Sequence, residues 1–154
     1  MTELNNLLAA DNFVERFYDG GTEIHDDCEF YVLKMDNPLD KNKSIRLRVT
    51  DEPDLSFLNS FYDSEDLSLE EENTAESFES NLLKIYSFLK PVISNEIISV
   101  SDSRNGHLRF NWILTLEQAD HTDLNSRFYS ELDLDFQVWT GSVDNSIIEI
   151  ITMK

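Results

Sequence analysis

The sequence is poor in residues on which several protein classes depend. It contains one cysteine, Cys28, so no disulfide can form within the chain, and a reducing compartment is the natural expectation. Its four glycines never fall in the spacing of a nucleotide-binding loop, and no Gly-x-Ser-x-Gly segment offers a hydrolase nucleophile. No stretch approaches the ~20 apolar residues of a membrane-spanning helix, and the chain does not open like a secretory signal. We therefore expect a cytoplasmic protein without a cofactor.

Basic residues are scarce as well. The 12 Lys and Arg residues stand against 31 Asp and Glu residues, which gives a net charge of −19. This charge repels nucleic acids and anionic membranes, and it favours a basic protein partner. No Lys or Arg occurs between Arg48 and Lys84, a stretch that contains eleven acids, and within it we expect an exposed acidic loop near 63–72. The alternative, that the acidity only keeps the protein in solution, is equally open.

The apolar content is sufficient for a folded interior. Hydrophobic residues make up 40% of the 154 residues, and they include 10 Phe, 5 Tyr and 2 Trp. That content argues against disorder over most of the chain. Because a chain of this length fits one folded unit, we predict a single domain over 1–154.

Helical periodicity predicts two main helices. Residues 3–18 place Leu and aromatic side chains on one face, and a Gly-Gly pair follows that would end the helix. Residues 73–90 open with an Asn–Glu capping pair and carry apolar groups at i, i+4, i+7 and i+11 from Phe78. Pro91 is expected to stop this second helix. A weaker helical pattern covers 118–129.

Upstream of the second helix, alternation of apolar and polar residues predicts one β-hairpin. Its strands are 28–35, rich in aromatic and β-branched residues, and 44–49, which has one apolar and one basic face. A short helix or turn is expected near 54–62.

Downstream, two further hairpins are predicted. The first covers 96–116 and turns at Asn105-Gly106, a pair that readily adopts the backbone of a tight turn. The second joins 132–139 to 147–152 through a turn at 141–145. The predicted fold is therefore α+β, with an antiparallel sheet built from β-hairpins and helices packed on one face, in the order αββ-α-ββ-α-ββ.

Two groups of residues form the predicted partner-binding surface. The first is the set of acids in the loop: Asp63, Glu65, Asp66, Glu70, Glu71 and Glu72. The second lies on the strand 132–139, where alternation puts Asp133, Asp135 and Trp139 opposite the apolar face. An exposed Trp ringed by acids can hold a cationic group through apolar burial and cation–π contact. The alternative, a Trp139 covered by another part of the chain, is the more common fate of this residue type.

The sequence also contains residues that could bind a metal. His25, Asp26, Asp27 and Cys28 are adjacent in sequence, and His121 lies between two aspartates. A transition-metal site would require these two clusters to meet in space. Acids are abundant in this chain, so such proximity in sequence carries little weight, and we expect no metal ligands and no catalytic residues. Cys28 is interpreted as a small buried residue of its strand.

The preferred hypothesis is a non-catalytic acidic protein that engages and inhibits a basic protein partner. A toxin-immunity protein that blocks a basic nuclease and a mimic of nucleic acid are examples of this type. One alternative is an adaptor or scaffold subunit of a larger complex, assembled through Ile-rich strands. The other is a small metal-dependent hydrolase.

Overall fold

The computed structural model describes residues 1–40, 43–50, 53–57, 60–72, 74–104, 107–115 and 134–142. The chain divides into two compact units, Met1–Lys90 and Pro91–Lys154, and each is described by itself. Among the described residues, the structure contains two helices and two antiparallel sheets, which confirms the α+β class. The single domain over 1–154 stays a prediction.

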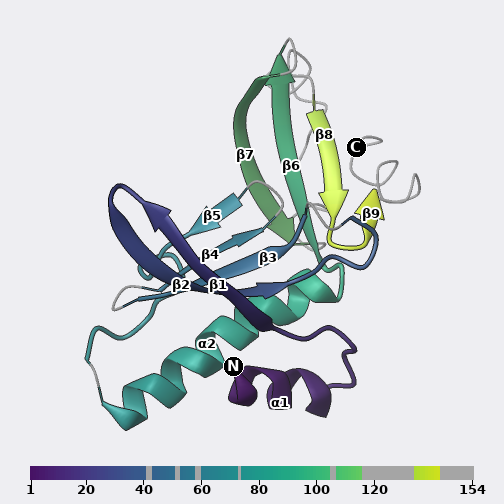
Figure 1. The fold of residues 1–154 in the computed structure, drawn as a ribbon. Coiled ribbons are helices and arrows are strands. Elements are labelled where there is room, and N and C mark those ends of the chain that lie inside the picture. Colours follow the sequence, from purple (N-terminus) through teal and green to yellow (C-terminus); the bar gives the residue numbers. More distant parts are fainter. Residues whose placement is uncertain are drawn as a thin grey trace. The chain divides into compact units, whose positions relative to one another are not determined.

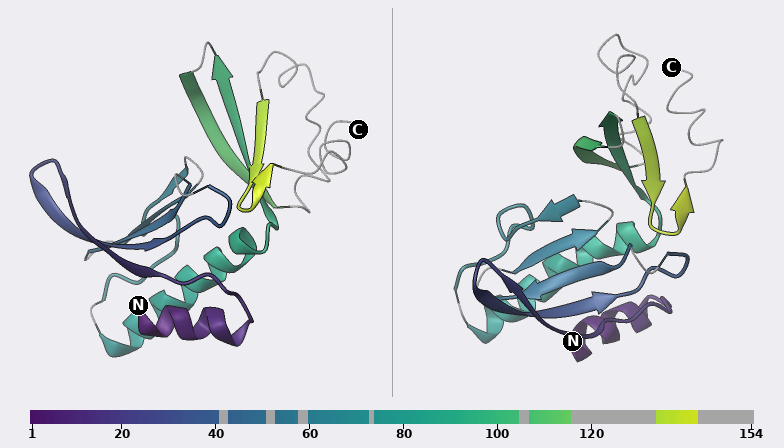
Figure 2. Two further views of the ribbon diagram at one scale, coloured as in Figure 1. Left: turned by 45° about the vertical axis from the view of Figure 1, so that its right-hand side comes forward. Right: turned by 45° about the horizontal axis from the view of Figure 1, so that its top comes forward.

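The first unit combines a five-stranded sheet with helices on one of its faces (Figures 1 and 2). Its elements are α1 (Thr2–Ala10), β1 (Tyr18–His25), β2 (Cys28–Met35), β3 (Ile45–Val49), β4 (Asp54–Phe57), β5 (Ser60–Tyr62) and α2 (Ala75–Ile93). The strands follow one another in the order β1-β2-β3-β4-β5, each antiparallel to the next. The boundary between the two units falls inside the last turn of α2.

The core of the first unit lies between this sheet and its two helices. Leu33, Leu47 and Leu55 stand opposite one another across β2, β3 and β4, and all three are buried. Leu8 of α1 and Leu89 of α2 are fully buried as well. Burying each such side chain completely stabilises the fold by roughly 1.5–3 kcal/mol, so this layer holds the unit together.

The start of α2 is fixed by a reciprocal cap. The Oγ1 of Thr74 accepts a hydrogen bond from the backbone N–H of Ser77 at 3.1 Å, and the Oγ of Ser77 accepts one from the N–H of Thr74 at 2.9 Å. The two bonds satisfy donors that the first helical turn leaves free.

The prediction that Pro91 stops the helix is wrong. Pro91 lies within the last turn of α2, which continues to Ile93. Near the end of a helix a proline removes a single N–H donor, so the cost stays local. Asn95, with a φ of 60°, then ends the helix, and the N–H of Glu96 bonds the carbonyl of Pro91 at 2.8 Å.

The second unit contains a four-stranded antiparallel sheet. Its strands are β6 (Ile97–Arg104), β7 (His107–Thr115), β8 (Leu134–Val138) and β9 (Gly141–Ser142), in the order β7-β6-β8-β9. β6 pairs on both sides, and its Ile98 and Val100 are fully buried. Trp139 follows β8 directly and is also fully buried.

Several sequence predictions are confirmed. β2 and β3 match the predicted strands 28–35 and 44–49 and pair as expected. β6 and β7 form the hairpin predicted over 96–116. The helix expected over 73–90 is α2. Among the described residues, five strands instead of the predicted two lie between α1 and α2, so the order of elements differs there from the predicted one.

The helix predicted over 3–18 is wrong beyond Ala10. The chain leaves the helix at Asn12, whose φ is 64°, and the side-chain amide of Asn5 bonds the backbone N–H and carbonyl of Phe17. Phe17 is buried while Val14 is 87% exposed, so the apolar residues after Ala10 do not share one helical face. Tertiary hydrogen bonds have overridden a periodic pattern.

The predictions for two other segments are also wrong. The helix or turn expected near 54–62 is the hairpin of β4 and β5, in which the rings of Phe57 and Tyr62 stack with centres 5.4 Å apart. The turn expected at 141–145 comes earlier, because β8 ends at Val138 and pairs with β9. The predicted helix 118–129 and strand 147–152 lie outside the described residues.

A small polar cluster links the end of α1 to α2 and makes the stability of the fold depend on pH in the acid range. The carboxylate of Asp11 accepts a hydrogen bond from the hydroxyl of Tyr86 and lies 2.7 Å from the Nζ of Lys90. The hydrogen bonds from Lys90 and Tyr86 lower the pKa of Asp11. Burial and the bond to Asp11 raise the pKa of Tyr86 to about 12, so its hydroxyl remains a donor at neutral pH.

We predict that this cluster loses its stabilising effect in acid. The pKa of Asp11 is lower in the folded state than the usual value of about 3.9, so the stabilisation is complete above that pH and fades as the pH falls towards the folded pKa. Asp11→Asn should therefore reduce the free energy of unfolding at pH 6, and the difference from wild type should shrink at pH 3. Urea unfolding at both values measures it. A difference that is the same at both would contradict the prediction.

None of the helices among the described residues is both long and apolar enough to cross a membrane.

Candidate partner-binding surface

The acidic segment 63–72 begins with a turn that uses two of its own carboxylates. Oδ1 of Asp63 accepts hydrogen bonds from the backbone N–H groups of Glu65 and Asp66, both at 2.9 Å. Oδ2 of Asp66 accepts one from the N–H of Asp63 at 3.2 Å. These bonds are typical of Asp in turns, and they give both residues a structural role.

Glu70 ties the end of this segment to α2. Its Oε1 accepts a hydrogen bond from Ser80 at 2.6 Å and lies 3.0 Å from the Nζ of Lys84. The side-chain amide of Asn81 bonds both the backbone N–H and the carbonyl of Glu70, at 2.7 Å and 3.0 Å. The bonds from Ser80 and Lys84 lower the pKa of Glu70, so its charge persists in mild acid.

The remaining three acids of the segment face solvent. Glu65, Glu71 and Glu72 are exposed, and among the described residues no hydrogen bond or ion pair engages their carboxylates. Asp63, Asp66 and Glu70 are exposed too. The structure therefore places all six predicted loop acids at the surface, with three of them available to a partner.

Beside these acids lies a groove with apolar walls, which we call the apolar groove. Its volume is about 370 Å³, and its lining comes from α1, β2, β3 and α2 and from the segments that follow β3 and precede α2. Its apolar lining includes Leu4, Leu33, Leu47, Phe78, Leu82 and Ile85. Glu70, Glu71 and Glu72 also line it, and so does Arg48, which is paired with Asp54, so acids dominate the charged part of the lining.

The prediction that Phe78, one of the residues of this groove, is buried is wrong. The pattern of α2 put Phe78 on the buried stripe, but its side chain is 58% exposed. Farther along the same stripe, Ile85 and Leu89 are buried. Helical spacing predicts which residues share a face but not how far along the helix the sheet covers that face.

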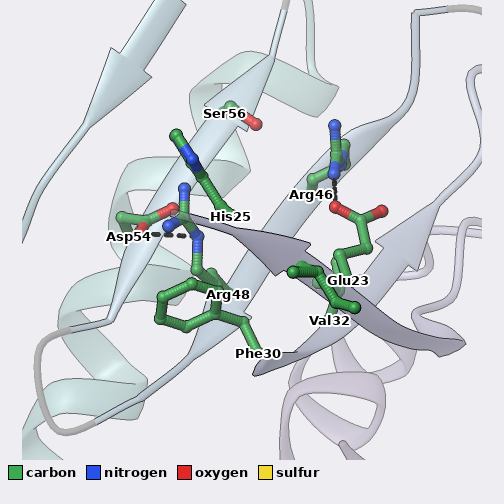
Figure 3. Close-up of a pocket in the computed structure, with 9 residues that line it drawn as sticks. Glu23, His25, Phe30, Val32, Arg46, Arg48, Asp54 and Ser56 are labelled. Carbon is green, nitrogen blue, oxygen red and sulfur yellow. Dashed lines mark ion pairs between the residues drawn. The ribbon is translucent and has the colours of Figure 1, made fainter. Parts of the chain in front are cut away.

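A second pocket of about 220 Å³ lies on the other face of the sheet (Figure 3). There the guanidinium of Arg48 lies over the ring of Phe30, and its Nε is 3.0 Å from Oδ2 of Asp54. Burial raises the pKa of Asp54, an effect that Arg48 opposes. Arg46 pairs with Glu23. Because each of these arginines already faces a carboxylate, this pocket offers less charge to a ligand than the acidic segment does.

Trp139 does not share an exposed surface with Asp135, contrary to the prediction for the strand 132–139. Asp135 is exposed and accepts a hydrogen bond from Gln137 at 2.7 Å, while Asp133 lies outside the described residues. Trp139 is 0% exposed, so the alternative of a covered Trp is the correct one. Alternation failed to place it because β8 ends at Val138, and the period of a strand does not extend into the following turn.

The predicted cluster around His25 proves to be a tight hairpin turn. His25 and Cys28 pair at the ends of β1 and β2, and the intervening Asp26 and Asp27 have φ values of 49° and 62°. Cys28 is exposed, which corrects its interpretation as a buried residue. Within the described ranges no three His, Cys, Asp or Glu side chains converge as metal ligands, and His121 lies outside them.

Comparison with protein-family models, with curated proteins and with solved structures finds no significant match.

Proposed function

We propose that this chain is a non-catalytic acidic binding protein that engages and inhibits a basic protein partner. The observation that carries the proposal is the acidic segment, whose Glu65, Glu71 and Glu72 are exposed without partners among the described residues. Unpaired surface carboxylates raise the local negative potential, which attracts a positively charged protein and orients it.

The neighbouring apolar groove supports the same function. Binding sites combine apolar area, which supplies most of the binding free energy, with charges that give orientation and specificity. Here both occur on the same unit and share Glu71 and Glu72. Inhibition follows when the covered surface is the one with which the partner binds a polyanionic substrate.

The proposal includes a cytoplasmic location. Its support is Cys28, which is free and exposed. Cysteines stay in the thiol form in reducing compartments such as the cytoplasm.

Affinity capture tests this function. The wild-type protein and the variant Glu65→Gln/Glu71→Gln/Glu72→Gln are immobilised, and a lysate of the source organism is passed over both. We expect the wild type to retain one or a few basic proteins that salt releases, and the variant to retain much less of them. Adding the wild type to the recovered partner should then reduce the partner's own activity.

Two results would contradict the proposal. One is the retention of neutral or acidic proteins only. The other is equal retention of the basic proteins by the wild type and by the variant, because the acids would then contribute nothing to recognition.

A further inference from the structure

We propose that the apolar groove receives a short segment of the basic partner in which one or two large apolar side chains are flanked by Lys or Arg. The inference rests on the proposed function and names the contact through which it operates. The groove supplies the pocket for the apolar anchor, and the acids beside it face the flanking cations.

The lining of the groove fits an apolar anchor. Leu4, Leu33, Leu47 and Ile85 line it and are themselves buried, and Phe78, which also lines it, is exposed. A volume of about 370 Å³ is near the lower end for ligand pockets, which suits a few side chains better than a whole helix or strand. An exposed aromatic residue next to buried aliphatic ones is a favourable place for a binding hot spot.

The charges beside the groove fit flanking cations. Glu71 and Glu72 are exposed, line the groove and have no partner among the described residues. Glu70, the third acid, is held to α2 by Ser80 and Asn81 and so fixes the backbone next to them. Preorganisation of this kind reduces the entropy lost on binding.

Charge also decides between the possible occupants. A second copy of this chain carries the same net charge of −19 and would be repelled from the acidic side. A nucleic acid or an anionic lipid would be repelled in the same way. A segment with Lys or Arg beside its apolar anchor is the occupant that satisfies both the apolar walls and the acids.

The test uses a short synthetic peptide with a Trp-Leu centre and Lys and Arg on both sides, titrated into the full chain. Two exposed apolar residues of α2 provide a matched pair of variants, since Phe78 lines the groove and Leu83, 53% exposed, does not. We expect Phe78→Ser to weaken peptide binding about tenfold and Leu83→Ser to leave it unchanged. Circular dichroism checks that both variants are folded.

A second matched pair tests the charges. Glu71→Gln/Glu72→Gln removes two charges from the groove, and Glu76→Gln/Glu79→Gln removes two from exposed positions of α2 that do not line it. The first variant should weaken binding and lessen its salt dependence, and the second should do so much less. In the wild type, peptide binding should shift the methyl resonances of Leu4, Leu47 and Ile85.

The results separate this inference from the proposed function. If the two variants of each matched pair weaken peptide binding equally, the groove is not the docking site. The same conclusion follows if peptide binding does not shift the methyl resonances of Leu4, Leu47 and Ile85. Either result leaves the proposed function as an acidic binding protein intact. If the peptide does not bind but lysate capture retains basic proteins, the inference fails and the proposed function stands. If the capture fails as well, both fail.

Discussion

Trp139→Ala is expected to destabilise the protein by about 3–5 kcal/mol, the largest effect of any single substitution considered in this chain. Among the residues whose burial the structure describes, Trp139 is the largest fully buried side chain, and its removal leaves a cavity that the surroundings fill only in part. Denaturant unfolding followed by circular dichroism measures the loss. Val14→Ala serves as the control, because Val14 is 87% exposed and should change stability by less than about 0.5 kcal/mol.

The same substitution separates the two interpretations of Trp139. An exposed hot spot would lose partner binding with little change in stability, whereas a buried side chain loses stability first. A measured loss below about 1 kcal/mol would contradict the packing described for Trp139. Trp139→Phe keeps part of the apolar volume, so it should keep much of the stability that Trp139→Ala loses.

Neutralising the free acids of the segment is expected to slow association by roughly tenfold at low salt. The variant is Glu65→Gln/Glu71→Gln/Glu72→Gln, which removes three charges and leaves the hydrogen bonds of Asp63, Asp66 and Glu70 in place. Because salt screens exposed charges over ~10 Å at 0.1 M, the difference from wild type should shrink as the ionic strength rises. Stopped-flow measurements with the basic peptide give the association rates of the wild type and of the variant at two salt concentrations.

A matched control removes the same charge from the β1–β2 turn and the start of β2. Asp26→Asn/Asp27→Asn/Glu29→Gln takes three exposed charges from residues that do not line the groove, and Asn tolerates the positive φ of the two turn positions. This control should slow association much less. Equal slowing by both variants would mean that only net charge matters, and an unchanged rate in the first would mean that the acids act only on solubility.

Local pattern was enough to predict some of the elements. In β3, the alternation of Ile45 and Leu47 with Arg46 and Arg48 specifies which face is buried, since the side-chain period of a strand is two. In α2, the spacing of Ile85 and Leu89 specifies the buried stripe. These signals are contained within a few neighbouring residues, so no knowledge of the rest of the chain is required.

β1 shows what local pattern misses. It is an edge strand with mostly exposed side chains, held to β2 by backbone hydrogen bonds that any sequence can make. Its pairing shifts register between Asp19 and Thr22, where Gly20 allows a close approach. A Cβ at Gly20 would lie 2.9 Å from the carbonyl oxygen of Val32, so this glycine serves the sheet and does not end a helix.

The sequence by itself determined the α+β class, the charge of −19 and the exposed acidic segment, because composition and short-range periodicity carry that information. Tertiary structure alone decided that Trp139 is buried, that Phe78 is exposed and that Glu71 and Glu72 lie beside an apolar groove. The groove, for example, brings together residues far apart in the chain, such as Leu4 of α1, Leu47 of β3 and Ile85 of α2. Which long-range contacts form is a property of the whole packed unit, and no local spacing specifies it.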